Sequence, residues 1–110
     1  CSSENTLRFN TIEENREGIR IEGPNNDNEI IRNTLRNNQK GFLIRYGARS
    51  NTISNNNICF NTRDDIRCES IFDENSYSRN TCNDISREQC NYDITCSNRC
   101  GVEPLRRLEL

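Results

Sequence analysis

The sequence predicts an all-β fold, a right-handed parallel β-helix of about four coils with a period of 23 residues. Three observations predict it. Asparagines recur at a fixed interval, apolar residues recur with them at a spacing of two, and the segments between asparagines are too short for α-helices. Each copy is therefore expected to form two or three short strands joined by tight bends.

Three asparagine columns define the repeat. The coils are expected to start near Asn5, Asn28, Asn51 and Asn75, which are 23, 23 and 24 residues apart. The second column follows five residues later, at Asn10, Asn33, Asn56 and Asn80. The third contains Asn15, Asn38 and Asn61, and the fourth copy breaks it with Ile85. Because Asn tolerates the left-handed backbone region and its amide both donates and accepts, these residues are expected at coil corners, as ladders of stacked amides.

Four apolar columns are expected to point inward and form the core. They are Leu7/Ile30/Ile53/Tyr77, Ile12/Leu35/Ile58/Cys82, Ile19/Phe42/Ile66/Ile94 and Ile21/Ile44/Cys68/Cys96. The last two columns place an insertion of about five residues, around 85–90, before the final turn. In the outward columns charges alternate in sign, as in Glu22, Arg45 and Glu69, which is typical of a solvated face.

Composition limits the functional classes. Only 31% of the residues are hydrophobic and mean hydropathy is -1.00, but a thin core can be continuous when every coil adds to it. The net charge of -2 comes from scattered residues, so no basic tract for nucleic acid or membrane surfaces is present. No apolar run approaches the roughly 20 residues of a membrane span.

The chain is expected to divide into repeats at 1–97 and a tail at 98–110. Pro104 stands where a short capping helix could begin, and a disordered tail is the alternative. Open coil ends expose strand edges, so we expect further coils, in a longer solenoid, or end-to-end association of copies.

Seven cysteines and no His, Met or Trp restrict the chemistry. The absence of His excludes Ser-His-Asp and Cys-His sites and His-ligated zinc or copper. Cys68, Cys82 and Cys96 fall in inward columns and are expected to pack in the core. Cys59, Cys90 and Cys100 are outside these columns, and they are candidates for a disulfide in an oxidising compartment.

Carboxylates near the last turns are the candidate catalytic residues. Asp64, Asp65 and Asp93 fall together in the repeat, with Arg67 beside them, and sugar hydrolysis or elimination uses carboxylates with a cationic neighbour. Asp65 and Asp93 take the places of Gly18 and Gly41, so a role as turn residues is the alternative. No cofactor is predicted, with Ca²⁺ on these carboxylates as a variant.

The repeat resembles a known family. Asn-Thr-Ile-Ser-Asn-Asn-Asn-Ile (51–58), Asn-Glu-Ile-Ile-Arg-Asn-Thr-Leu (28–35) and Glu-Gly-Ile-Arg-Ile (17–21) are similar to the parallel β-helix repeats of NosD-like proteins, carbohydrate-binding proteins and sugar hydrolases. The resemblance covers roughly 5–97. It implies an extracytoplasmic protein that binds polysaccharide, acts as a lyase, hydrolase or epimerase, or assists copper delivery. Catalytic motifs of pectate lyases and mannuronan epimerases have no match here.

The sequence therefore favours a non-catalytic structural or carbohydrate-binding β-helix module of a secreted or surface protein. The alternative is the remnant of a polysaccharide lyase, hydrolase or epimerase that uses Asp64, Asp65 and Asp93. A polysaccharide or glycan is the expected ligand. Whether those carboxylates converge in a groove or serve their own turns separates the two.

Overall fold

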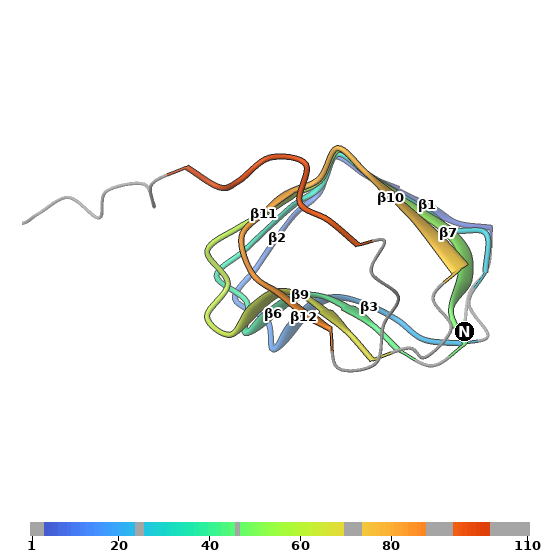
Figure 1. Ribbon diagram of the computed structural model, residues 1–110, viewed down its shortest axis with the longest axis horizontal. Helices are drawn as coiled ribbons and strands as arrows, with labels where there is room; N and C mark the ends of the chain where they lie inside the picture. The colour runs from blue at the N-terminus through green and yellow to red at the C-terminus, as the bar shows by residue number, and fades with distance from the viewer. Residues whose placement is uncertain (1–3, 24–25, 46, 70–73, 88–93, 102–110) are drawn as a thin grey trace, which may run out of the picture.

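The computed structural model confirms the predicted parallel β-helix (Figure 1). It describes residues 4–23, 26–45, 47–69, 74–87 and 94–101. Within these ranges the secondary structure is β-strand alone, arranged as three parallel four-stranded sheets that form the walls of the coil. No helix in the described part of the chain has the length and apolar character needed to cross a membrane.

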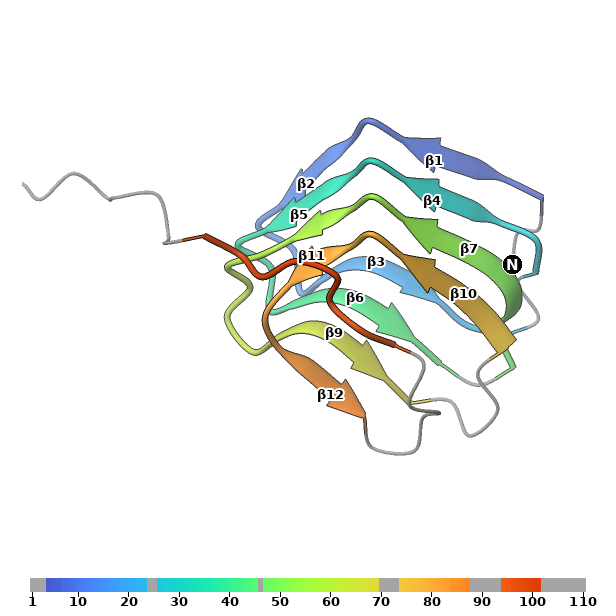
Figure 2. The ribbon, with the colours of Figure 1, turned by 45° about the horizontal axis from the view of Figure 1, so that its top comes forward.

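Each wall contains one strand from every coil (Figure 2). The first sheet contains β1 (Thr6–Arg8), β4 (Glu29–Ile31), β7 (Arg49–Ser54) and β10 (Glu74–Ser78). The second contains β2 (Thr11–Glu13), β5 (Thr34–Arg36), β8 (Asn57–Ile58) and β11 (Thr81–Cys82). The third contains β3 (Glu17–Ile21), β6 (Lys40–Ile44), β9 (Asp64–Cys68) and β12 (Ile85–Arg87). Four strands per sheet match the four copies, and the chain completes about three full turns from β1 to β10.

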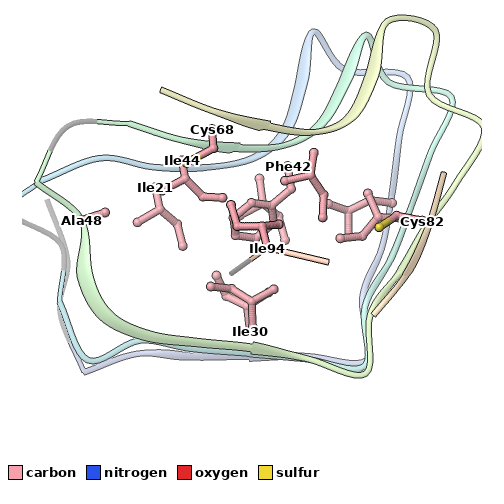
Figure 3. Packing of buried hydrophobic residues seen from close by; sticks show 13 residues of the cluster. Ile21, Ile30, Phe42, Ile44, Ala48, Cys68, Cys82 and Ile94 are labelled. Atoms are coloured by element: carbon pink, nitrogen blue, oxygen red, sulfur yellow. The ribbon is translucent and has the colours of Figure 1, made fainter. Parts of the chain in front are cut away.

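The strand register reproduces the predicted apolar columns through the first three coils. Leu7, Ile30, Ile53 and Tyr77 are consecutive partners, and so are Ile12, Leu35, Ile58 and Cys82. Ile19, Phe42 and Ile66 align in the third sheet, beside Ile21, Ile44 and Cys68. These side chains fill the interior (Figure 3), and those in the middle coils are almost inaccessible to solvent.

The predicted register of the fourth coil is wrong after Cys82. Ile85, not Ile94, pairs with Ile66, and Arg87, not Cys96, pairs with Cys68. The separation from the second apolar column to the third is seven residues at Ile12–Ile19 and only three at Cys82–Ile85. The fourth coil thus shortens its third corner where an insertion was expected, because an acceptor from the previous coil takes over that corner, as described below.

Two neighbouring residues share the work of each corner. Ten non-glycine residues have a positive φ between 55° and 61°, and every one of them directly precedes a ladder asparagine. They include Phe9 and Arg32 and are mostly not asparagines, so the expectation that the ladder Asn itself adopts the left-handed conformation is wrong. The left-handed residue bends the chain, and the next residue turns its amide inward.

The predicted amide ladders are confirmed. In each column the backbone N–H and the Nδ2 of one asparagine donate to Oδ1 of the equivalent asparagine in the next coil. In the second column the distances are 3.1 Å for both bonds from Asn10 to Asn33, and 2.9 and 3.1 Å from Asn33 to Asn56. The spare Nδ2 hydrogen of Asn33 reaches the carbonyl of Leu7 at 2.9 Å. The ladder therefore has a direction, with acceptors facing the N-terminal coil and donors facing the C-terminal coil.

Residues 94–101 lie across the C-terminal end of the coil (Figure 1). Ile94 is fully buried and points into the interior (Figure 3). The N–H groups of Ser97 and Asn98 donate to the carbonyl of Asn80, and the N–H of Cys82 donates to that of Asn98. This short stretch adds the beginning of a further strand to β11 and covers the last coil.

Candidate functional site

The four predicted site residues do not share one surface. Asp64 and Arg67 lie on the outer face of the third sheet, both partly exposed. Asp65 is the neighbour of both in β9 but is only 1% exposed. Asp93 lies outside the described residues. Their catalytic role stays a prediction, and the contacts of the three described residues indicate what each does in the fold.

Asp65 ends the third asparagine ladder. Its Oδ1 accepts the Nδ2 of Asn61 at 3.1 Å and the backbone N–H of Asn61 at 3.4 Å. Its Oδ2 accepts the backbone N–H groups of Asn83 at 2.8 Å and Asp84 at 3.2 Å. Both oxygens are therefore occupied by N–H donors of the protein, and the contacts to Asn61 are those that a fourth asparagine would make.

An exchange of residue types in the sequence explains this arrangement. A Cβ on Gly41 would come within 2.6 Å of the Nδ2 of Asn61, so the earlier coils need glycine here to admit the next ladder asparagine. The third coil has Asp65 at this position, and the fourth coil lacks the asparagine that would need the space. The loss of Asn and the gain of Asp are one substitution in space. That paired change was the available signal for Asp65, and sequence reasoning missed it.

Asp64 and Arg67 belong to a chain of ion pairs across the outer face of the third sheet. The pairs in order are Glu17–Arg20 at 3.4 Å, Arg20–Glu22 at 2.9 Å, Glu22–Arg45 at 3.8 Å, Arg45–Glu69 at 3.5 Å, Glu69–Arg67 at 3.6 Å and Arg67–Asp64 at 3.5 Å. The hydrogen bond from Arg20 lowers the pKa of Glu22 and raises that of Arg20. Signs alternate along this chain, so it offers no concentration of one charge to a ligand.

A small hollow opens where the C-terminal segment passes the fourth coil. Its volume is about 290 Å³, and it is lined by Asn83, Ile85, Thr95, Cys96 and Arg99. Asn83 is held in place because its Oδ1 accepts the N–H of Cys100 at 2.8 Å. An amide, a hydroxyl and a guanidinium beside an aliphatic side chain provide donors, acceptors and an apolar contact. Such a set suits a small polar ligand.

Disulfides hold the C-terminal segment against the coil. Cys59 is bonded to Cys100 and Cys82 to Cys96, and Cys68 is also disulfide-bonded. The predicted disulfide role of Cys59 and Cys100 is therefore confirmed. The expectation that Cys68, Cys82 and Cys96 pack as free thiols is wrong, although Cys68 and Cys82 are fully buried in the core. The error for Cys82 and Cys96 follows from the register, because Cys96 lies in the covering segment and not in the third sheet.

Comparison with known proteins gives one match. The family described as periplasmic copper-binding protein (NosD) matches residues 1–100. No curated protein and no solved structure shows a significant match to the chain. The match agrees with the resemblance in the asparagine repeat, and a periplasmic family confirms the predicted location outside the cytoplasm.

The residues present do not fit a copper ion. Copper in proteins is bound by imidazole, thiolate or thioether groups, and this chain has neither His nor Met. Five of the seven cysteines are in disulfides, and the other two, Cys1 and Cys90, lie outside the described residues. The described residues contain no cluster of three or more His, Cys, Asp or Glu side chains arranged to hold a metal. The predictions of no cofactor, and of Ca²⁺ as its variant, stay predictions.

Proposed function

The chain belongs to the NosD family, and we propose that it is a non-catalytic periplasmic β-helix module that binds carbohydrate beside its last coil. The observation that carries this proposal is the hollow of about 290 Å³ under the C-terminal segment. Its Asn83, Thr95 and Arg99 side chains offer the hydrogen-bonding groups that sugar hydroxyls require, and Ile85 offers an apolar contact. The volume suits one or two sugar rings at the end of a longer glycan.

The contacts of Asp65 support a non-catalytic role. A carboxylate that transfers protons or attacks an anomeric carbon must reach its substrate. Asp65 is buried, and both its oxygens already accept hydrogen bonds from the backbone or side chain of neighbouring coils. It therefore serves the fold, and Asp64 alone would be left on the outer face beside Arg67.

A glycan array followed by calorimetric titration tests the proposal. Wild-type protein is expected to bind at least one oligosaccharide, and Arg99→Gln to weaken its affinity about tenfold, because a hydrogen bond from a charged group contributes roughly 1.5 kcal/mol or more. Arg63→Gln is the matched control, since Arg63 is also an exposed arginine but lies away from the hollow. The absence of any glycan binding would contradict carbohydrate recognition and leave a structural module.

The enzyme alternative has its own measurement. The Asp64–Arg67 pair at 3.5 Å, on the outer face of β9, is the arrangement that a polysaccharide lyase, hydrolase or epimerase remnant would use. Depolymerisation of a polysaccharide by wild-type protein, lost in Asp64→Asn but kept in Glu13→Gln, would favour this alternative. Glu13 is a suitable control because it is also ion-paired on an outer face, with Arg36.

A further inference from the structure

The two ends of the coil are complementary, and we propose that the N-terminal coil is a docking surface for the C-terminal end of a second copy, an interface that the covering segment 94–101 blocks. The first coil presents its apolar residues incompletely covered. Leu7 and Ile12 are partly exposed, whereas Ile53 and Ile58 in the same two columns are fully buried. Strands β1, β2 and β3 are the edges of their sheets.

The asparagine ladder gives this surface a chemical direction. Each ladder Oδ1 accepts two N–H groups from the preceding coil, as Oδ1 of Asn33 does from Asn10. Among the described residues none donates to Oδ1 of Asn5, Asn10 or Asn15. The N-terminal end therefore presents acceptors, and it fits a coil that presents backbone and amide donors. Two N-terminal ends facing each other would place acceptors against acceptors, so head-to-head pairing is disfavoured.

The fourth coil of another copy carries those donors. Asn80 stands one coil beyond Asn56 in the same ladder, with its N–H facing the C-terminal end. In the present structure Ser97 and Asn98 bond to β11 there, and Ile94 covers the core. The disulfides Cys59–Cys100 and Cys82–Cys96 hold that segment in place. When it is displaced, β10 and β11 of one copy can extend the sheets that begin with β1 and β2 of the next.

The test removes the anchors of the segment and measures mass in solution. The Cys59→Ala, Cys100→Ala double variant keeps the Cys82–Cys96 bridge, and a quadruple variant lacks both bridges. We expect both to retain the β-sheet signal in circular dichroism. Light scattering should then show oligomers that grow with concentration, in multiples of the 12.8 kDa chain, with the larger effect in the quadruple variant. Wild-type protein is expected to remain a monomer under the same conditions.

A block at the other end shows whether the contact is head to tail. Adding Leu7→Lys and Ile12→Lys to the quadruple variant places charge on the accepting surface and should restore the monomer. Wild-type protein mixed in excess should shorten the oligomers, because it can accept a copy but cannot donate. Oligomers that persist after the lysine block would overturn the proposal, and so would monomeric variants. Loss of β-sheet signal in both variants would also overturn it, since the proposed interface requires four coils that stand without the segment.

Discussion

The first coil and the last coil are made from the same repeat but end the molecule in different ways. In the first coil Leu7 and Ile12 are partly exposed and three ladder oxygens have no donor among the described residues. In the last coil Cys82 and Ile94 are fully buried, Asp65 closes one ladder and disulfides hold a covering segment. The comparison teaches that a coil end is closed by residues that break the repeat, and that following the repeat leaves an end open.

Removing the ladder-closing carboxylate should have the largest effect. Asp65→Ala leaves four N–H donors near the last coil without an acceptor, and each buried unsatisfied group costs about 1–3 kcal/mol. We expect a loss of about 5 kcal/mol in the free energy of unfolding, measured by urea denaturation. Asp65→Asn keeps one acceptor oxygen and should lose clearly less. Equal stability of the alanine variant and the wild type would show that the corner closes without this side chain.

The two disulfides should contribute next, in the order of the loops they close. Cys59–Cys100 spans 41 residues and Cys82–Cys96 spans 14, which corresponds to about 4 and about 3 kcal/mol from the entropy of the unfolded chain. Urea denaturation of the two double-alanine variants measures both values. A larger loss for Cys82→Ala, Cys96→Ala would show that packing of the buried Cys82, rather than loop entropy, dominates.

The asparagine ladder should lose strength toward the open end. Asn33→Ala removes the acceptor of two N–H groups and two donors from a side chain that is 1% exposed, and we expect a loss of about 3 kcal/mol. Asn10→Ala removes one ladder donor at the first coil, and we expect less than about 1 kcal/mol. Thermal unfolding of the pair compares them, and equal losses would mean that the first coil is covered in solution.

The smallest effect is expected from the surface ion pairs. The hydrogen bond from Arg20 lowers the pKa of Glu22, so this group stabilises the fold above its unfolded pKa, and the contribution disappears as pH falls through the lowered folded value. The stability difference between wild type and Glu22→Gln should therefore favour wild type at pH 7 and vanish below about pH 4. A difference that stays constant between pH 7 and pH 3 would contradict this assignment.

The repeat was predictable from sequence because stacked coils place equivalent residues on one another. The columns through Leu7 and Ile12 were therefore correct in all four members. The fourth coil was not predictable by extending the period, because Asp65 replaces an asparagine that lies one coil further along the chain. The sequence placed Ile94 and Cys96 in strands for the same reason: apolar residues two apart suit a covering segment as well as a wall.

The candidate site followed the same division. Asp64, Asp65 and Arg67 are close in sequence, and this closeness suggested one cluster. Alternation along β9 separates them, because successive side chains of a strand point to opposite faces. The hollow near Asn83 and Arg99 depends on where the C-terminal segment crosses the last coil, and no local pattern in the sequence specifies that crossing.

The separation of tasks at the corners has a consequence for how such coils can change. The bending residue carries its side chain outward and accepts Phe, Arg, Ser, Glu or Asp, while the asparagine after it alone makes the axial bonds. The outer rim of every corner is thus open to substitution at little thermodynamic cost. A lineage of these proteins can vary its rim to meet new surroundings while its interior stays fixed, and an engineer can place reporter groups at Phe9, Arg32 or Arg79 with the same freedom.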